Sequence, residues 1–167
     1  MTTNPTTATQ AGSGEATAVR TSIHVAAAPG RAFEVFTAGM DSWWNRDHHV
    51  LPGTLNAIGV EPRDGGLLWE ENDRGERCAW GRVLTWDPPR TFAFAWLVGP
   101  DWGVPADDAP GSRVTVTFTP APGGTCVELV HDRLDAHGEG WQGVRDGVGS
   151  DGGWPAGLRA FAAAVPA

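Results

Sequence analysis

The feature that most constrains the fold of this sequence is a series of short segments with apolar residues at every second position. They are separated by turns rich in glycine and proline, and the clearest of them alternates Phe92, Phe94 and Trp96 with smaller residues. A period of two is typical of β-strands that bury one face. The segments lie at 19–27, 54–60, 67–72, 76–86, 90–98, 113–119 and 125–134. The sequence therefore predicts about seven strands, the last five of them consecutive, in an antiparallel sheet.

Helical spacing follows the first of these strands. The expected apolar face of a short amphipathic helix consists of Ala32, Phe33, Phe36 and Met40. Pro29 stands where a first helical turn tolerates proline. The next stretch, DSWWNRD at 41–47, is expected to form a second short helix.

A helix is also expected at the end of the chain, where Trp154, Leu158, Phe161 and Val165 recur at helical steps. The segment 138–153 before it contains seven glycines. Because each glycine inside a helix costs about 1 kcal/mol relative to alanine, this segment is expected to be either a weak helix or a mobile gate. These elements describe an α+β fold in which a curved sheet grips a C-terminal helix.

Composition sets further limits. Residues 1–17 are small and polar, and we expect a disordered tail followed by one domain at 18–167. A formal net charge of −8 and the lack of a basic cluster argue against binding to nucleic acid or to a membrane surface. No apolar run is long enough to span a membrane, so the expected location is the cytoplasm. We expect no cofactor, and either a monomer or a homodimer.

Several stretches together resemble the SRPBCC (START and Bet v 1-like) superfamily, specifically its bacterial branch of Hsp90-ATPase-activator homologues. They include MDSWWNRDHHV, VEPRDGGLLWE, WGRVLTWDPPRTFAFAW and VTVTFTPAPGGTCVELVHDRL, together with the closing GWPAGLRAFAAAV. The resemblance implies a helix-grip fold, with seven antiparallel strands around the C-terminal helix and a hydrophobic cavity between them. Members of the superfamily bind lipids, sterols, plant hormones or polyketides, and some act as aromatases or cyclases.

Nine tryptophans and no tyrosine are present. Core packing is the simplest role for the four in strands, which are Trp69, Trp80, Trp86 and Trp96. The other five lie where a helix-grip cavity would have its wall and rim. The full set of candidate lining residues is Trp43, Trp44, Trp80, Phe94, Trp96, Val116, Phe118, Leu129, His131, Trp141, Trp154, Leu158 and Phe161. Candidate rim residues are Asp47, His48, His49 and Trp102.

No catalytic or metal-binding pattern is evident. His48 and His49 lack further convergent donors with a metal-ligand spacing, so we expect no metal site. His131, on the apolar face of the last strand, is either a hydrogen-bonded core residue or the one titratable group of the cavity, and it is the only weak catalytic candidate.

Three functions remain open. The first is a binding protein for a small apolar ligand, aromatic or lipid-like. The second is an aromatase- or cyclase-like enzyme in which His131 moves protons with Asp132 or Asp41. The third is an activator that takes a chaperone ATPase as its partner, which depends on analogy with the family name alone. We favour them in this order.

Overall fold

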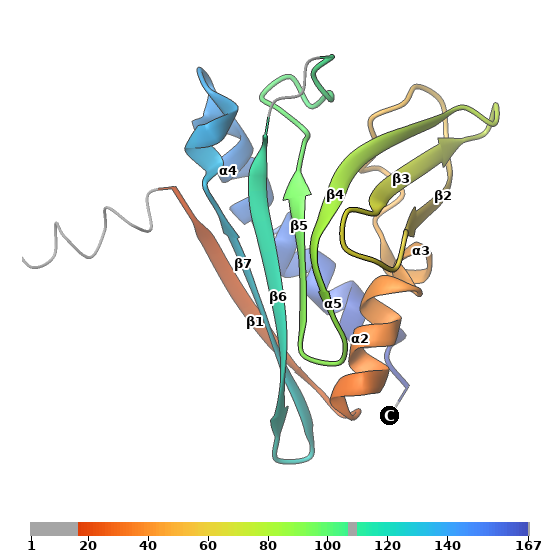
Figure 1. Cartoon of the computed structure of the whole chain (residues 1–167), viewed down its shortest axis with the longest axis vertical. Helices are drawn as coiled ribbons and strands as arrows, with labels where there is room; N and C mark the ends of the chain where they lie inside the picture. Colours follow the sequence, from red (N-terminus) through yellow and green to blue (C-terminus); the bar gives the residue numbers. More distant parts are fainter. Residues whose placement is uncertain (1–16, 107–109, 167) are drawn as a thin grey trace, which may run out of the picture.

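Seven strands form a single antiparallel sheet in the computed structural model, which describes residues 17–106 and 110–166 (Figure 1). The strands are β1 (Val19–Val25), β2 (Leu55–Val60), β3 (Leu67–Asn72), β4 (Arg77–Asp87), β5 (Thr91–Trp96), β6 (Ser112–Ala121) and β7 (Gly124–Asp132). The predicted seven-stranded sheet is confirmed. Of the tail predicted at 1–17, all but Thr17 lies outside the described residues.

The order of the strands is β1-β7-β6-β5-β4-β3-β2, so the first strand pairs with the last. Val19 lies opposite His131 and Val25 opposite Thr125. Every other pairing joins strands that follow each other in sequence, which is a meander built from hairpins. The sheet is curved, and β1 and β2 form its two edges (Figure 1).

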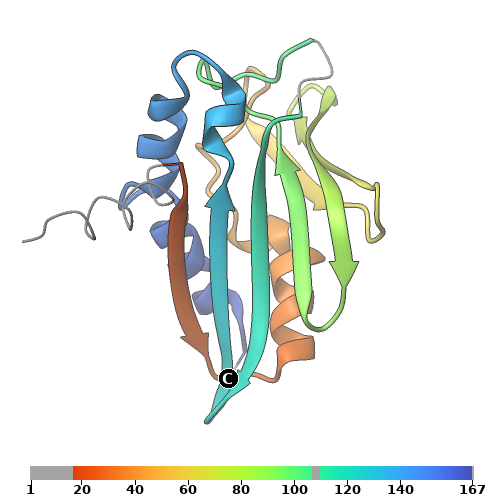
Figure 2. The same ribbon diagram turned by 60° about the vertical axis from the view of Figure 1, so that its left-hand side comes forward.

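The helical elements are α2 (Pro29–Thr37), α3 (Met40–Trp43), the 3-10 turn η1 (Leu134–His137), α4 (Trp141–Gly149) and α5 (Trp154–Ala164). Helices α2 and α5 lie side by side on the same face of the sheet (Figure 2). α5 buries Trp154, Leu158 and Phe161 against it. The expected α+β helix-grip arrangement, with short helices after the first strand, is therefore present.

Phenylalanines fill the space between α2 and the middle of the sheet. Phe33 and Phe36 of α2 contact Phe92 and Phe118, with ring centroids 5.2–6.4 Å apart, and Phe36 also meets Phe161 of α5 at 5.2 Å. All five are at most 3% exposed. Because full burial of one such side chain contributes roughly 1.5–3 kcal/mol, this cluster is a main source of stability.

The helical segments differ in detail from the sequence expectations. The stripe that included Met40 is not one helix: α2 ends at Thr37, and Met40 begins α3. Gly39 lies between them where an added Cβ would stand 2.7 Å from the Val35 carbonyl oxygen, so the chain turns there. The helix expected at 41–47 ends at Trp43, and the segment 138–153 contains a regular helix, α4, in spite of its glycines.

None of the helices in the described part of the chain has the length and apolar character that crossing a membrane requires.

Candidate functional site

A cavity of about 640 Å³ lies between the sheet and the two C-terminal helices, a volume typical of small-molecule sites. One wall comes from β2, β3, β4 and β5, the opposite wall from α4 and α5, and the segment 43–50 closes the side between them. Its lining residues are Trp43, Trp44, Asn45, Asp47, His48, His49, Val50, Ile58, Glu70, Trp80, Trp96, Val98, Trp102, Gly147, Val148, Ser150, Gly152, Gly153, Trp154, Ala156, Gly157 and Ala160.

Four of the lining tryptophans contact one another in a closed ring, which we call the tryptophan quartet: Trp44, Trp80, Trp96 and Trp154. The ring centroids are 5.1 Å apart for Trp44 and Trp80, 5.5 Å for Trp80 and Trp96, 5.6 Å for Trp96 and Trp154, and 6.1 Å for Trp154 and Trp44. These separations fall within the range of favourable aromatic pairs. The quartet joins α3's end, two strands and α5 in one surface, so it fixes the shape of the apolar part of the cavity.

The indole N–H groups of the quartet are not available to the cavity. Trp44 donates to the His48 carbonyl oxygen at 2.8 Å, and Trp154 donates to His131 Nδ1 at 3.0 Å. The N–H groups of Trp80 and Trp96 are buried and have no acceptor among the residues that the structure describes. An unpaired buried donor costs about 1–3 kcal/mol, which the packing of the two indoles must offset.

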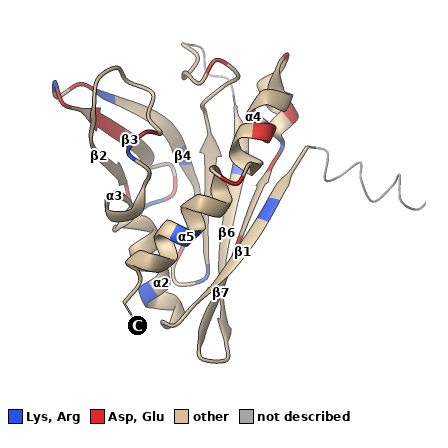
Figure 3. Cartoon of the chain, turned by 180° about the vertical axis from the view of Figure 1, so that it is seen from behind, with Lys and Arg blue, Asp and Glu red and all other residues tan. Residues whose placement is uncertain are grey.

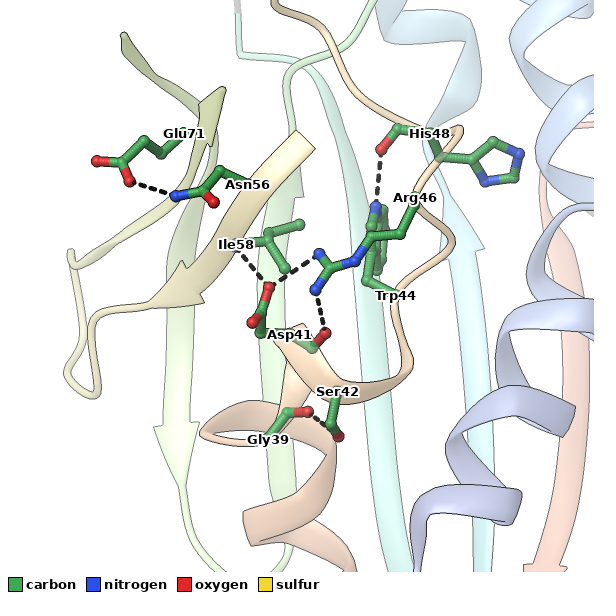
Figure 4. A network of polar contacts seen from close by, with 9 residues as sticks. All are labelled: Gly39, Asp41, Ser42, Trp44, Arg46, His48, Asn56, Ile58 and Glu71. Atoms are coloured by element: carbon green, nitrogen blue, oxygen red, sulfur yellow. Dashed lines mark hydrogen bonds and ion pairs between the residues drawn. The ribbon is translucent and has the colours of Figure 1, made fainter. Parts of the chain in front are cut away.

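The segment that carries the rim residues is attached to the sheet through Asp41 (Figure 4). Asp41 Oδ1 accepts hydrogen bonds from the Ile58 backbone N–H at 3.0 Å and from Arg46 Nη1 at 2.9 Å. Arg46 Nη2 also donates to the Asp41 carbonyl oxygen at 2.9 Å. One carboxylate therefore connects α3 to β2 and holds the start of the cavity wall.

Glu70 is the one lining carboxylate that is nearly inaccessible, with 3% of the residue exposed. Its oxygens accept hydrogen bonds from the backbone N–H groups of Val50 and Leu51 at 2.9–3.0 Å. Within residues 17–106 and 110–166, no arginine or histidine forms an ion pair with it. Sequence reasoning missed Glu70, because the buried face of β3 is Leu68, Glu70 and Asn72, and two polar residues of three give no apolar alternation in the sequence.

Apart from Val148 and Trp154, the helical wall is made of small residues, and these leave the space that the cavity occupies. Ala156, Gly157 and Ala160 of α5 face it, as does Gly147 of α4. Sequence reasoning treated the glycines of this region as a flexibility signal and did not identify them as lining. Gly153 allows the sharp turn between the helices, because a Cβ there would collide with the Val148 carbonyl oxygen.

Trp102 covers part of the opening from the loop between β5 and β6. Its backbone has a positive φ of 61°, which is uncommon for a residue other than glycine, and 49% of the residue is exposed. Its ring lies over Gly147, where an added Cβ would stand 2.5 Å from Trp102 Cη2. Only a glycine in α4 lets the indole approach this closely.

Some of the predicted lining residues lie in the cavity, and others lie in the packed core. In the cavity it places Trp43, Trp44, Trp80, Trp96 and Trp154, as well as all four predicted rim residues, Asp47, His48, His49 and Trp102. In the packed core, outside the lining, it places Phe94, Val116, Phe118, Leu129, Leu158 and Phe161. The reason is that α2 covers the centre of the sheet, where its phenylalanines leave no free space.

Two more tryptophans lie elsewhere than expected. Trp141, at the start of α4, is half-buried and lies 5.2 Å from the Arg145 guanidinium, outside the lining. Trp69 is not a core residue: its ring lies 4.2 Å from the guanidinium of Arg77 and against Gly59. Strand alternation explains this, because Trp69 points to the face opposite Leu68 and Glu70.

His131 is fully buried behind the quartet and does not line the cavity. Its ring lies 5.3 Å from that of Trp96 and 6.2 Å from that of Trp154. Burial, and to a lesser degree the nearby His137, lower the pKa of His131 to about 3, against the opposing effect of Asp132. The imidazole is therefore neutral near pH 7, and the indoles of Trp96 and Trp154 lie beside it.

The rim histidines have few potential metal ligands around them. In the described part of the chain, no group of three or more His, Cys, Asp and Glu side chains converges on one point. His49 donates from Nδ1 to the Leu51 carbonyl oxygen at 2.8 Å, which fixes its ring at the cavity edge. Together with His48 and Asp47, it gives the rim a polar character.

Comparisons with known proteins agree with this architecture. The family model described as Activator of Hsp90 ATPase homolog 1-like protein matches residues 26–165. An anthrahydroquino-gamma-pyrone synthase, Txn09, solved in complex with SUM, is 34% identical and covers 89% of this chain and 97% of its own, with a TM-score of 0.64. CalC from Micromonospora echinospora, a self-sacrificing resistance protein, is 26% identical and covers 89% and 94%, with a TM-score of 0.61.

A third structure, protein NE0264 from Nitrosomonas europaea, is 13% identical with a TM-score of 0.63, and covers 89% of this chain and 94% of its own, so it shares the fold alone. A comparison with curated proteins finds no match.

Proposed function

The chain belongs to the Activator of Hsp90 ATPase homolog 1-like family, and from its cavity we propose that it binds a small, largely aromatic ligand between the sheet and the C-terminal helices. The observation that carries this proposal is the tryptophan quartet, whose four members all line the same cavity. Indoles arranged in this way offer rigid apolar surfaces that stack on flat rings and lose little conformational entropy when they do so.

The polar groups of the cavity lie at one side of it. Asp47, His48 and His49 form the rim, and Glu70 lies deeper on β3. An apolar cavity with few polar groups on one side is the usual design of a site that holds a hydrophobic ligand in one orientation. A flat ligand with its polar substituents at one end fits this distribution.

The similarity to the synthase supports an aromatic ligand over a lipid. That relative is named for an anthrahydroquino-gamma-pyrone, a fused aromatic ring system, and it is 34% identical over most of this chain. We therefore place fused-ring compounds, including aromatic polyketides, ahead of fatty acids and sterols as ligands.

The test is a titration with hydroxyanthraquinones, followed by tryptophan fluorescence and by thermal unfolding. Ala156→Leu reduces the cavity from the α5 side, and Ala163→Leu places the same side chain on the same helix outside the lining. We expect saturable quenching and a raised melting temperature for the wild type and for Ala163→Leu, and at least tenfold weaker binding for Ala156→Leu. Equal binding by both variants would place the ligand elsewhere.

An enzymatic role is the second candidate, and the synthase relative is the observation that favours it. The acid–base groups at the ligand would then be Glu70, Asp47, His48 or His49, which line the cavity, and not His131, which does not. Turnover of a bound polyketide chain would support this role, and loss of turnover with retained binding in Glu70→Gln would assign the group. Activation of a chaperone ATPase rests on the family name alone, and an ATPase assay with the partner chaperone tests it.

A further inference from the structure

Among the described residues, the Asp, Glu, Lys and Arg side chains that line the cavity are all acidic. Its lining contains two carboxylates, from Asp47 and Glu70, and neither lysine nor arginine among the described residues that form it. On the side of the molecule from which α4 and α5 are seen, acidic residues lie on β3 and on α4, and a basic residue lies on α5 (Figure 3). The whole chain has a formal net charge of −8. The two carboxylates of the lining and the negative net charge of the chain therefore disfavour an anionic ligand.

The buried position of Glu70 makes its charge effective. Among the described residues, the carboxylate has only the N–H groups of Val50 and Leu51 as donors, and these occupy three of its lone-pair directions at most. A carboxylate removed from water and left without a cation is unfavourable, and a cation placed beside it recovers strong attraction because little solvent screens the pair. Glu70 can therefore accept one further hydrogen bond, and it lines the cavity.

The tryptophan quartet strengthens the same preference. The N–H groups of its indoles either donate within the protein or are covered, so they offer no donors to an anion. The four indoles line the cavity, and the face of an indole attracts cations through the ring quadrupole more strongly than any other aromatic side chain. Aromatic rings next to a buried carboxylate form the usual recognition site for an organic ammonium group.

We propose that the cavity selects aromatic ligands that carry a positively charged amino group, with Glu70 and the tryptophan quartet as the specificity determinants. This inference rests on the proposed ligand-binding function and names the ligand class. The amine lies against Glu70 on β3, and the ring system lies on the quartet. Fatty acids and aromatic carboxylates are rejected because their charge would face Glu70 and Asp47.

The experiment uses three anthracenes that differ in one substituent on the central ring: hydroxymethyl, aminomethyl or carboxylate. Binding to the wild-type chain is measured by calorimetry near pH 7, at low and at high salt. We expect the ammonium compound to bind at least about tenfold more tightly than the carboxylate, with the neutral compound between them. The preference should persist at high salt, because a buried pair is weakly screened.

Glu70→Gln and Glu71→Gln form the matched pair of variants. Glu71 is the next residue and points away from the cavity, where it pairs with Arg77 at 3.0 Å. We expect Glu70→Gln to remove most of the ammonium preference and Glu71→Gln to retain it. If Glu70→Gln does not fold because Val50 and Leu51 lose their acceptor, the wild-type series still decides the question without it.

The outcomes separate the two proposals. Binding of the neutral anthracene without any advantage for the ammonium compound would overturn the charge selectivity and leave the ligand-binding function standing. A failure of all three compounds to bind would remove the ligand-binding function and the inference with it. Tighter binding of the carboxylate would overturn the assignment of Glu70.

Discussion

Trp154 and His131 are joined by a hydrogen bond whose direction fixes the protonation of the histidine. The indole Nε1–H lies 3.0 Å from His131 Nδ1 and can only donate, so Nδ1 is the acceptor. The neutral imidazole then carries its hydrogen on Nε2, which lies 2.7 Å from Ser112 Oγ. Ser112 Oγ lies 2.8 Å from His137 Nε2, so a single chain of hydrogen bonds leads from the cavity wall to η1.

This arrangement predicts that stability falls in mild acid. The pKa of His131 is about 3 in the folded chain, against an ordinary value of 6.5, and burial also lowers the pKa of His137. Above pH 6.5 the histidine is neutral in both states and the folded arrangement keeps its full stability. Below pH 6.5 only the unfolded chain takes up the proton, so His131 lowers the free energy of unfolding by about 1.4 kcal/mol per pH unit.

Urea unfolding between pH 7 and pH 5 measures this slope before most carboxylates titrate. We expect His131→Gln to be less stable at pH 7 but to show a much smaller slope. His48→Gln, at an exposed rim position, serves as the control and should keep the slope of the wild type. An unchanged slope in His131→Gln would show that the histidine is protonated in the folded chain.

The two cysteines should differ in reactivity. Burial, together with the nearby Glu70, raises the pKa of Cys78 to about 11, whereas Cys126 is exposed on β7. Because the thiolate is the reactive form, a rise of about two pKa units leaves roughly one hundredth of the usual thiolate. Iodoacetamide at pH 8 should label Cys126 alone, and mass spectrometry of the peptides checks it. In guanidinium both should react, and rapid labelling of Cys78 in the folded chain would contradict its burial.

Gly147 and Gly143 of α4 give a matched test of the contact with Trp102. A methyl group at position 147 would meet the Trp102 ring, whereas nothing lies within 4 Å of a Cβ at position 143. Gly143→Ala should stabilise the chain by about 0.5–1 kcal/mol and leave ligand kinetics unchanged.

Gly147→Ala should displace the exposed indole and open the cavity, so a bound hydroxyanthraquinone should dissociate several-fold faster in stopped-flow measurements. Equal dissociation rates in the two alanine variants would mean that Trp102 does not cover the opening.

Asp41 and Arg46 form one ion pair, but we expect them to contribute unequally to the free energy of unfolding. Asp41→Ala leaves the Ile58 N–H without its acceptor and detaches α3 from β2, so we expect a loss of about 1–3 kcal/mol. Arg46→Ala removes only the exposed partner and should cost under about 1 kcal/mol. Chemical denaturation compares the two. If the two variants lose similar amounts of stability, the contribution comes from the Asp41–Arg46 ion pair and not from the hydrogen bond between Asp41 and the Ile58 N–H.

The sheet was predictable because its strands alternate over several residues and burial follows that alternation. β6 is the clearest case, since Val114, Val116 and Phe118 are all at most 3% exposed. Alternation does not reveal irregular pairing. In β4, Trp80 and Arg82 have the same parity, yet Trp80 is buried and Arg82 exposed, because the register shifts where this strand pairs with β3.

The cavity was only partly predictable, for a related reason. The sequence indicates which residues face the helices, but the packing of α2 and α5 decides which of those are covered. Phe118 and His131 both point to the inner face of the sheet. Phe118 is covered by α2, whereas His131 lies behind Trp154. Trp44 and Trp154 lie in the cavity because they belong to the ends of helical segments, where the packing is open.

The pairing of β1 with β7 also determines the order in which the strands can pair during translation. Val25 lies opposite Thr125, which leaves the ribosome 100 residues later. At common translation rates of about 5–20 residues per second, roughly 5–20 s pass between the synthesis of β1 and that of β7, its one partner strand in the described part of the chain. During that interval β1 is an unpaired edge, and every hairpin of the meander can form before it is used. The strand that is synthesised first, β1, is therefore the last to join the sheet.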